Sequence, residues 1–144
     1  MATAIYDDRG IRFEYPFSWD IEVGDDGPRT SVTILSTDGP AFALVTIDDS
    51  RPAPGEMADE ALTALREEYP QLDAYPASET INGHPSVGHD VEFFSLDMTN
   101  TCAIRCFQTS RRTVFVIMQW SDSEENEPES LLAAVRRSIE ETDS

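Results

Sequence analysis

The residues best suited to acid–base or metal chemistry lie close together in one segment of the sequence. His84 and His89 are its two histidines, and Asp90 and Glu92 follow directly. Histidine and carboxylate side chains are a common acid–base pair and common zinc ligands. In an extended strand, however, His89 points to the face opposite to Asp90 and Glu92. Because a zinc site needs three or four converging ligands, we expect a hydrogen-bonded His89, a turn residue at His84 and no metal site.

Two cysteines, Cys102 and Cys106, could supply a nucleophile. Their surroundings match no thiol-enzyme motif, and no predicted helix N-terminus activates them. Four residues apart in a predicted strand, their Cα atoms are about 13 Å apart, whereas a disulfide needs about 4.4–6.8 Å. Both share a face with Ile104, so we expect buried, unpaired thiols and a reducing compartment. An enzyme or small-ligand protein using His89 with Asp90 or these cysteines remains an alternative.

Acidic residues dominate the charge of the chain. There are 28 acids and 10 bases, all of them arginine, and the formal net charge is −18. Nucleic acids and anionic membranes bind basic surfaces, so we expect neither as a partner. The charge either serves solubility in a salty cytoplasm or meets a basic partner, and both explanations stay open.

Local clusters of charge suggest two further sites. Five acids lie between Asp122 and Glu129, but this run lacks the glycine of a calcium loop, so we expect it to stabilise a helix N-terminus. Arg111 and Arg112 lie in a predicted turn. They could form an anion pocket if the arginines at 9 and 12 approach, or a solvated hairpin tip if they do not. No phosphate-binding loop, nucleophile elbow or zinc-protease motif occurs, and we expect no cofactor.

The elements that position these residues follow from the apolar pattern. Period-two alternation around the Tyr15-Pro16 break predicts two strands, Ile11–Tyr15 and Trp19–Val23, that enter one antiparallel sheet, turn and re-enter it. Asn82-Gly83 predicts a hairpin turn. Further strands are expected at 31–36, 41–47, 78–81, 87–96, 102–109 and 113–120. Helical spacing of apolar residues predicts helices at 56–69 and 127–141.

Two of the predicted strands are apolar on both faces, which fixes the layers. Residues 41–47 and 114–118 each need a layer above and a layer below, and the two helices can supply them. The fold class is therefore α+β, a three-layer α/β/α sandwich around a mostly antiparallel sheet. A chain of 144 residues is long enough for a single domain over residues 1–144.

This layout resembles that of the PsbP-like superfamily. The resemblance rests on a Phe-x-Tyr-Pro-x-x-Trp opening (Phe13 to Trp19 with Tyr15-Pro16), a mid-chain helix, the turn Ile81-Asn-Gly-His-Pro85, long hairpins and a closing amphipathic helix. It extends over roughly residues 11–139 of the chain. It implies a PsbP-like fold. It also implies a non-catalytic docking protein, because members of this group resemble one another in docking to other proteins without catalysing a reaction.

We therefore expect a non-catalytic protein-binding or adaptor module rather than an enzyme. It would dock a protein partner on a sheet edge or in a groove beside the C-terminal helix, and we choose Arg111, Arg112 and Trp120 as candidate partner-binding residues. The alternative is a small acidic chaperone for a secreted effector, which would be a homodimer with an exposed apolar groove. Because the N-terminus lacks a signal-peptide pattern and no apolar run is long enough to span a membrane, we expect a soluble, cytoplasmic protein.

Overall fold

Strands make up most of the fold. The computed structural model describes residues 2–122 and 127–142, and in this part of the chain ten strands form two antiparallel sheets. The larger sheet has the order β3-β4-β5-β9-β8-β7-β6, and the smaller one has the order β1-β2-β10. The larger sheet contains β3 (Asp20–Asp26), β4 (Arg29–Leu35), β5 (Phe42–Asp48), β6 (Asp73–Ile81), β7 (His84–Ser95), β8 (Met98–Gln108) and β9 (Thr113–Ser121). The smaller sheet contains β1 (Thr3–Asp8), β2 (Ile11–Pro16) and β10 (Glu140–Glu141).

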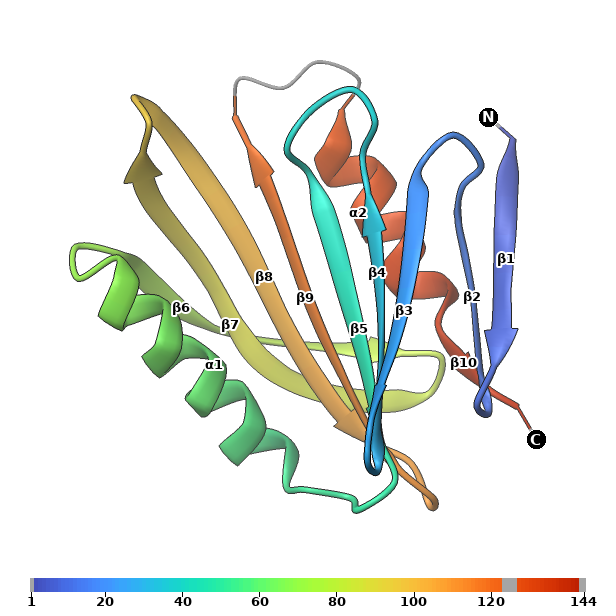
Figure 1. Cartoon of the computed structure of the whole chain (residues 1–144). Coiled ribbons are helices and arrows are strands. Elements are labelled where there is room, and N and C mark those ends of the chain that lie inside the picture. Colours follow the sequence, from blue (N-terminus) through green and yellow to red (C-terminus); the bar gives the residue numbers. More distant parts are fainter. Residues whose placement is uncertain (1, 123–126, 143–144) are drawn as a thin grey trace.

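Two helices complete the layers. Helix α1 (Pro54–Glu68) packs on β7, β8 and β9, and helix α2 (Pro128–Ser138) packs on the opposite face together with β2 (Figure 1). Each begins with a proline in its first turn, where the missing N–H costs no hydrogen bond. The layers are thus α1, the seven-stranded sheet, and α2 with the small sheet. The predicted α/β/α sandwich with a mostly antiparallel sheet is confirmed.

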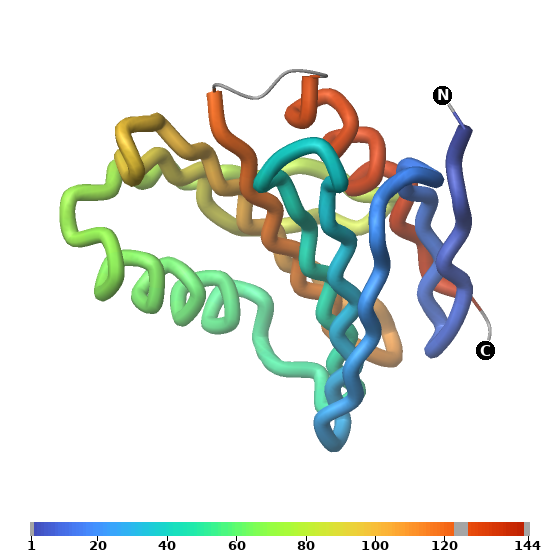
Figure 2. The backbone as a smooth tube through the Cα atoms, turned by 45° about the horizontal axis from the view of Figure 1, so that its top comes forward, coloured from blue at the N-terminus to red at the C-terminus, as the bar shows by residue number. Residues whose placement is uncertain are grey.

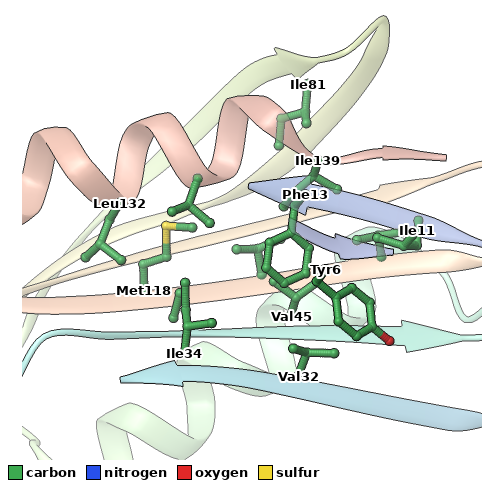
Figure 3. Packing of buried hydrophobic residues seen from close by; sticks show 14 of the residues in the cluster. Tyr6, Ile11, Phe13, Val32, Ile34, Val45, Ile81, Met118, Leu132 and Ile139 are labelled. Carbon is green, nitrogen blue, oxygen red and sulfur yellow. The ribbon is translucent and has the colours of Figure 1, made fainter. Parts of the chain in front are cut away.

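The sheet separates two hydrophobic cores. The larger core lies between the sheet and the layer of α2 and the small sheet, where Phe13, Met118 and Leu132 are fully buried (Figure 3). The smaller core lies under α1 and contains Val91, Ile104 and both cysteines. Strand β9 contributes to both, because Val116 faces one core and Phe115 the other. The two-sided apolar pattern of β9 therefore predicted its central position in the sheet correctly.

The chain between β2 and β3 does not re-enter the same sheet, contrary to the prediction. Strand β2 belongs to the small sheet and β3 to an edge of the large one. The Pro16 carbonyl accepts a hydrogen bond from the Trp19 amide (3.0 Å), and this tight turn moves the chain from one layer to the other. Trp19 is buried, but Ile21 and Val23 remain exposed because β3 has a neighbour on one side only.

The prediction that β5 is covered on both faces is wrong for one of them. Ala43 and Val45 are buried under the layer of α2 and the small sheet. On the other face Phe42 and Leu44 are half-buried, because α1 lies over β7, β8 and β9 instead. Figure 2 shows α1 beside the β3–β4–β5 half of the sheet rather than over it. This half of the face is open.

Three strand boundaries were not predictable from composition alone. Strands β1 and β10 carry weak or very short patterns, and they form only because β2 pairs with both. Strand β6 begins at Asp73 and includes Pro76, which a central strand would not tolerate. It is an edge strand, so the missing proline N–H faces no neighbour.

Candidate functional site

A groove runs between α2 and the sheet, over β7, β8 and the end of β9. We call it the α2 groove. It has a volume of about 310 Å³ and is open along one side. It is lined by Asp90, Glu92, Thr101, Ala103, Arg105, Trp120, Glu129, Ala133, Arg136 and Arg137. This is the groove beside the C-terminal helix in which the sequence placed a partner, and it contains the predicted Trp120.

Strand register arranges the floor of the α2 groove in rows. Glu92 pairs with Thr101 and Thr101 with Trp120, so these side chains lie side by side across three strands. The next row on the same face of β8 is centred on Ala103, whose small side chain leaves the floor open. The row after that one contains Arg105. The helix contributes Glu129, Ala133 and Arg136 at spacings of four and three residues, which place them on one face.

Two buried arginines form the base of one end of this groove. Arg105 donates from Nε to Glu79 (3.0 Å) and from Nη2 to Asp90 (2.9 Å), and Arg136 Nε donates to the same Glu79 carboxylate. Arg136 Nη1 lies 3.6 Å from the thioether sulfur of Met118, which is a weak acceptor. Burying two cations around one carboxylate is costly unless the hydrogen bonds are complete. Arg136 thus keeps donor capacity that neither Glu79 nor Met118 satisfies.

Arg137 adds an exposed cation at the same end of the α2 groove. Its guanidinium forms no ion pair with any carboxylate of residues 2–122 or 127–142. Its donors are available to a ligand.

The three predicted partner-binding residues end up in different environments. Trp120 is half-buried, with its ring in the α2 groove. Arg111 is exposed at the β8–β9 turn. Arg112 is not on the surface: it is 6% exposed and donates from Nη1 to the Gly10 carbonyl and to Glu141, both at 3.1 Å. The partner-binding prediction itself stays a prediction, and in this conformation Arg112 ties β9 to the small sheet.

The suggested anion pocket at this turn is also occupied by the chain itself. Arg9 contacts Asp25 at 3.1 Å, and Arg12 contacts Glu140 at 3.2 Å. With Arg112 bound to a glutamate as well, all three guanidiniums already face a carboxylate. No open cluster of cations forms there among the described residues.

Comparison with solved structures identifies the fold. The cyanobacterial PsbP (CyanoP) of Synechocystis superposes with a TM-score of 0.67 at 11% identity, over 97% of this chain and 92% of that one. The fold is PsbP-like. LpqN of Mycobacterium tuberculosis, involved in cell envelope biogenesis, matches with a TM-score of 0.63 at 12% identity, over 98% of this chain and 91% of that one. The predicted resemblance is confirmed at the level of fold.

A third structure shows the same PsbP-like arrangement within a longer chain. A protein from Bacteroides thetaiotaomicron matches with a TM-score of 0.61 at 10% identity, over 94% of this chain. This chain spans about half of that one, 46%. The sequence itself matches no protein-family model and no curated protein.

Neither histidine joins a cluster with catalytic geometry in the described part of this PsbP-like fold. His89 Nε2 lies 2.9 Å from Oδ1 of the exposed Asp59 on α1, and it faces away from Asp90, as the strand pattern predicted. His84 opens β7 after the Asn82-Gly83 turn, and its ring stacks on Phe107 with 5.3 Å between centroids. Among the described residues, no three histidine, cysteine or acidic side chains could hold a metal ion together.

Both cysteines are unpaired and fully buried under α1. Burial raises the pKa of Cys102 to about 12, with a further contribution from the Asp90 carboxylate. Burial alone raises the pKa of Cys106 to about 12. At neutral pH both are thiols rather than thiolates, and a thiol is a poor nucleophile.

The acidic run considered for calcium falls partly on residues 123–126, outside the described residues.

A second groove lies beside α1, on the open half of the sheet. We call it the α1 groove. It has a volume of about 420 Å³, with an apolar floor of Leu44, Met57 and Phe115. Asp26, Arg29, Ser31, Thr46, Glu60 and Ala61 complete its lining. It exists because a single helix covers only half of this face.

Sequence reasoning missed the charged residues that shape the α2 groove. Glu79, Arg105 and Arg136 come from a strand, a strand and a helix that are far apart in sequence. One signal was available: Arg105 interrupts the apolar run Cys-Ala-Ile-Arg-Cys-Phe, and a charge inside a buried strand requires a partner. The identity of that partner depends on strand order.

In the same described ranges, no helix is long and apolar enough to cross a bilayer.

Proposed function

We propose that this protein is a non-catalytic module that binds a segment of a partner protein in the α2 groove. The observation that carries the proposal is one open groove that is lined both by the half-buried Trp120 and by arginines with unsatisfied donors. Tryptophan and arginine are the residues most enriched at binding hot spots, because they combine contact area with directional donors. The unreactive thiols support a binding role over catalysis.

The charge of the chain supports a partner that is basic overall. A net charge of −18 steers basic proteins toward the molecule and repels nucleic acid and anionic membranes. Two unpaired, buried thiols suit a reducing compartment, which supports a cytoplasmic location. Both statements are part of the proposal.

Site-directed photo-crosslinking tests this function. A photo-crosslinking amino acid in place of Ala133 lies in the α2 groove, whereas the same residue in place of Ala64 lies on the exposed side of α1. We expect a discrete crosslinked protein in host cells from position 133 that position 64 does not give. The same adduct should vanish when Trp120→Ala is added. Equal adducts from both positions, or an adduct unaffected by Trp120→Ala, would argue against the groove.

The chaperone remains the second candidate, and the α1 groove favours it. An apolar floor that the fold leaves open is the surface a chaperone needs for a client segment. This candidate predicts a homodimer, and size-exclusion chromatography with light scattering measures the oligomeric state directly. A strict monomer at all concentrations would exclude it.

A further inference from the structure

The charged residues of the α2 groove are segregated along its length. Glu92 lies in the same cross-strand row as Trp120. Glu129 lies in the first turn of α2, at the end of the molecule where β9 also ends (Figure 1). Neither glutamate forms an ion pair within residues 2–122 and 127–142. This end therefore presents an aromatic ring and two carboxylates that have no ion pair in the described part of the chain.

The opposite end of the groove is cationic. Arg105 and Arg136 meet there on the shared Glu79, and the unpaired Arg137 follows on the helix. Asp90, midway along the groove, is held by Arg105 at 2.9 Å. Arg105 and Arg136 thus hold two carboxylates between them, whereas Arg137 holds none among the described residues. An additional carboxylate that binds there would give Arg137 an ion-pair partner.

The separation of the two ends follows from the elements that carry them. Thr101 and Arg105 are four residues apart in β8, which corresponds to about 13 Å. Glu129 and Arg136 are seven residues apart in α2, which corresponds to about 10 Å. An extended peptide covers the same distance between side chains that are about four positions apart in its sequence.

We propose that the α2 groove recognises an extended segment of a partner protein in which a lysine or arginine lies about four residues from an aspartate or glutamate. The basic side chain would lie over Trp120 between the two free glutamates, a cation–π and ion-pair site. The acidic side chain would bind Arg136 and Arg137. Charge complementarity at both ends selects this pattern over a uniformly basic segment, which the arginines repel. The inference rests on the proposed function.

Short synthetic peptides provide the test. The probe is acetyl-Lys-Ser-Ala-Ser-Glu-amide, and the controls are the same composition with the two charges adjacent, a Lys/Lys version and a Glu/Glu version. Each is titrated into isotope-labelled full-length protein and followed by NMR at the indole N–H of Trp120. The indole of the buried Trp19 is an internal reference. We expect the probe to shift the Trp120 signal with at least fivefold higher affinity than each control.

Charge reversal at the cationic end sharpens the test. Arg137→Glu should weaken the probe about fivefold, the size of one modest exposed ion pair, and should strengthen the Lys/Lys peptide. Arg66→Glu makes the same change of charge on exposed α1 and should leave both affinities unchanged. The inference would be overturned if the probe and the adjacent-charge control bound with equal affinity. It would also be overturned if Arg137→Glu bound the probe and the Lys/Lys peptide with the same affinities as the parent.

The two proposals fail in distinguishable ways. If the crosslink at position 133 forms but no peptide moves the Trp120 signal selectively, the charge pattern is wrong and the proposed function stands. If the crosslink is absent as well, the proposed function fails with it.

Discussion

At the scale of single residues, this protein places each buried arginine of its described part where a carboxylate can hold it. Arg105 and Arg136 share Glu79 inside the α2 groove, and Arg112 holds Glu141 beside the small sheet. Buried arginine requires such partners, because an uncompensated guanidinium in the interior costs several kcal/mol. Arg137 is exposed in the α2 groove and has no ion pair among the described residues, so its donors are available to a ligand.

The buried thiols give a direct prediction at this scale. Because the pKa values of Cys102 and Cys106 are raised to about 12, iodoacetamide at neutral pH should label neither in the folded protein. Both should react fully in denaturant, which serves as the control. Mass spectrometry counts the adducts. Rapid labelling of the native protein would mean that a thiolate is accessible and would revive a thiol-based enzyme.

Asp48 predicts a pH dependence of stability. Burial alone would raise its pKa, but hydrogen bonds from Ser50 and the ion pair with Arg29 (2.7 Å) outweigh it and lower the pKa below the ordinary value of 3.8. A lowered folded-state pKa contributes stability above pH 3.8, and this stability is lost as the pH falls through the folded-state value. Asp48→Asn should therefore cost about 2 kcal/mol near neutral pH, the scale of hydrogen bonds to a charged group.

The difference in unfolding free energy between Asp48→Asn and the parent should shrink as the pH falls through the lowered pKa of Asp48, because the parent carboxyl then becomes neutral too. Denaturant unfolding across a pH series measures it. Asp38→Asn is the matched control, since Asp38 is exposed, forms no ion pair within residues 2–122 and 127–142, and should change little. A difference that stays constant down to strongly acidic pH would contradict the assignment.

At the scale of elements, tight turns and close strand contacts hold the walls of the α2 groove. Asn82 and Gly83 turn with φ of 45° and 85°, values that glycine and asparagine tolerate best. The Asn82 side chain donates to the carbonyls of Arg137 (3.0 Å) and Ile139 (2.5 Å). The β6–β7 hairpin is thereby fixed to the end of α2, so that strand wall and helix wall keep their spacing.

Gly88 is the element-scale position with the sharpest prediction. It pairs with Arg105, and a Cβ there would lie 1.8 Å from the Ile104 carbonyl oxygen, which is backbone and cannot rotate away. Gly88→Ala should force β7 from β8 and destabilise the protein by about 3 kcal/mol, the upper range for overpacking. Gly24→Ala is the matched control in a strand, because its Cβ meets nothing within 4 Å. Equal unfolding midpoints of the two variants in urea would refute this contact.

At the scale of the whole molecule, sequence patterns predicted layers better than connections. Both helices, the two-sided β9 and the Asn82-Gly83 turn follow from local periodicity and turn chemistry, and all are present. The assignment of β2 and β3 to different sheets does not follow, because alternation identifies a strand but not its neighbour. The same limit explains why the sequence could not predict that Glu79 pairs with Arg105 and Arg136.

The most direct test of the proposed role is native mass spectrometry of the protein purified gently from its own host. The parent and the Arg66→Glu variant should carry a stoichiometric mass increment of protein size above the 16.0 kDa chain. A variant that combines Trp120→Ala with Arg137→Glu should be folded but lack this increment, because both ends of the α2 groove are removed. A bare chain for the parent, or an increment that survives in the groove variant, would contradict the account.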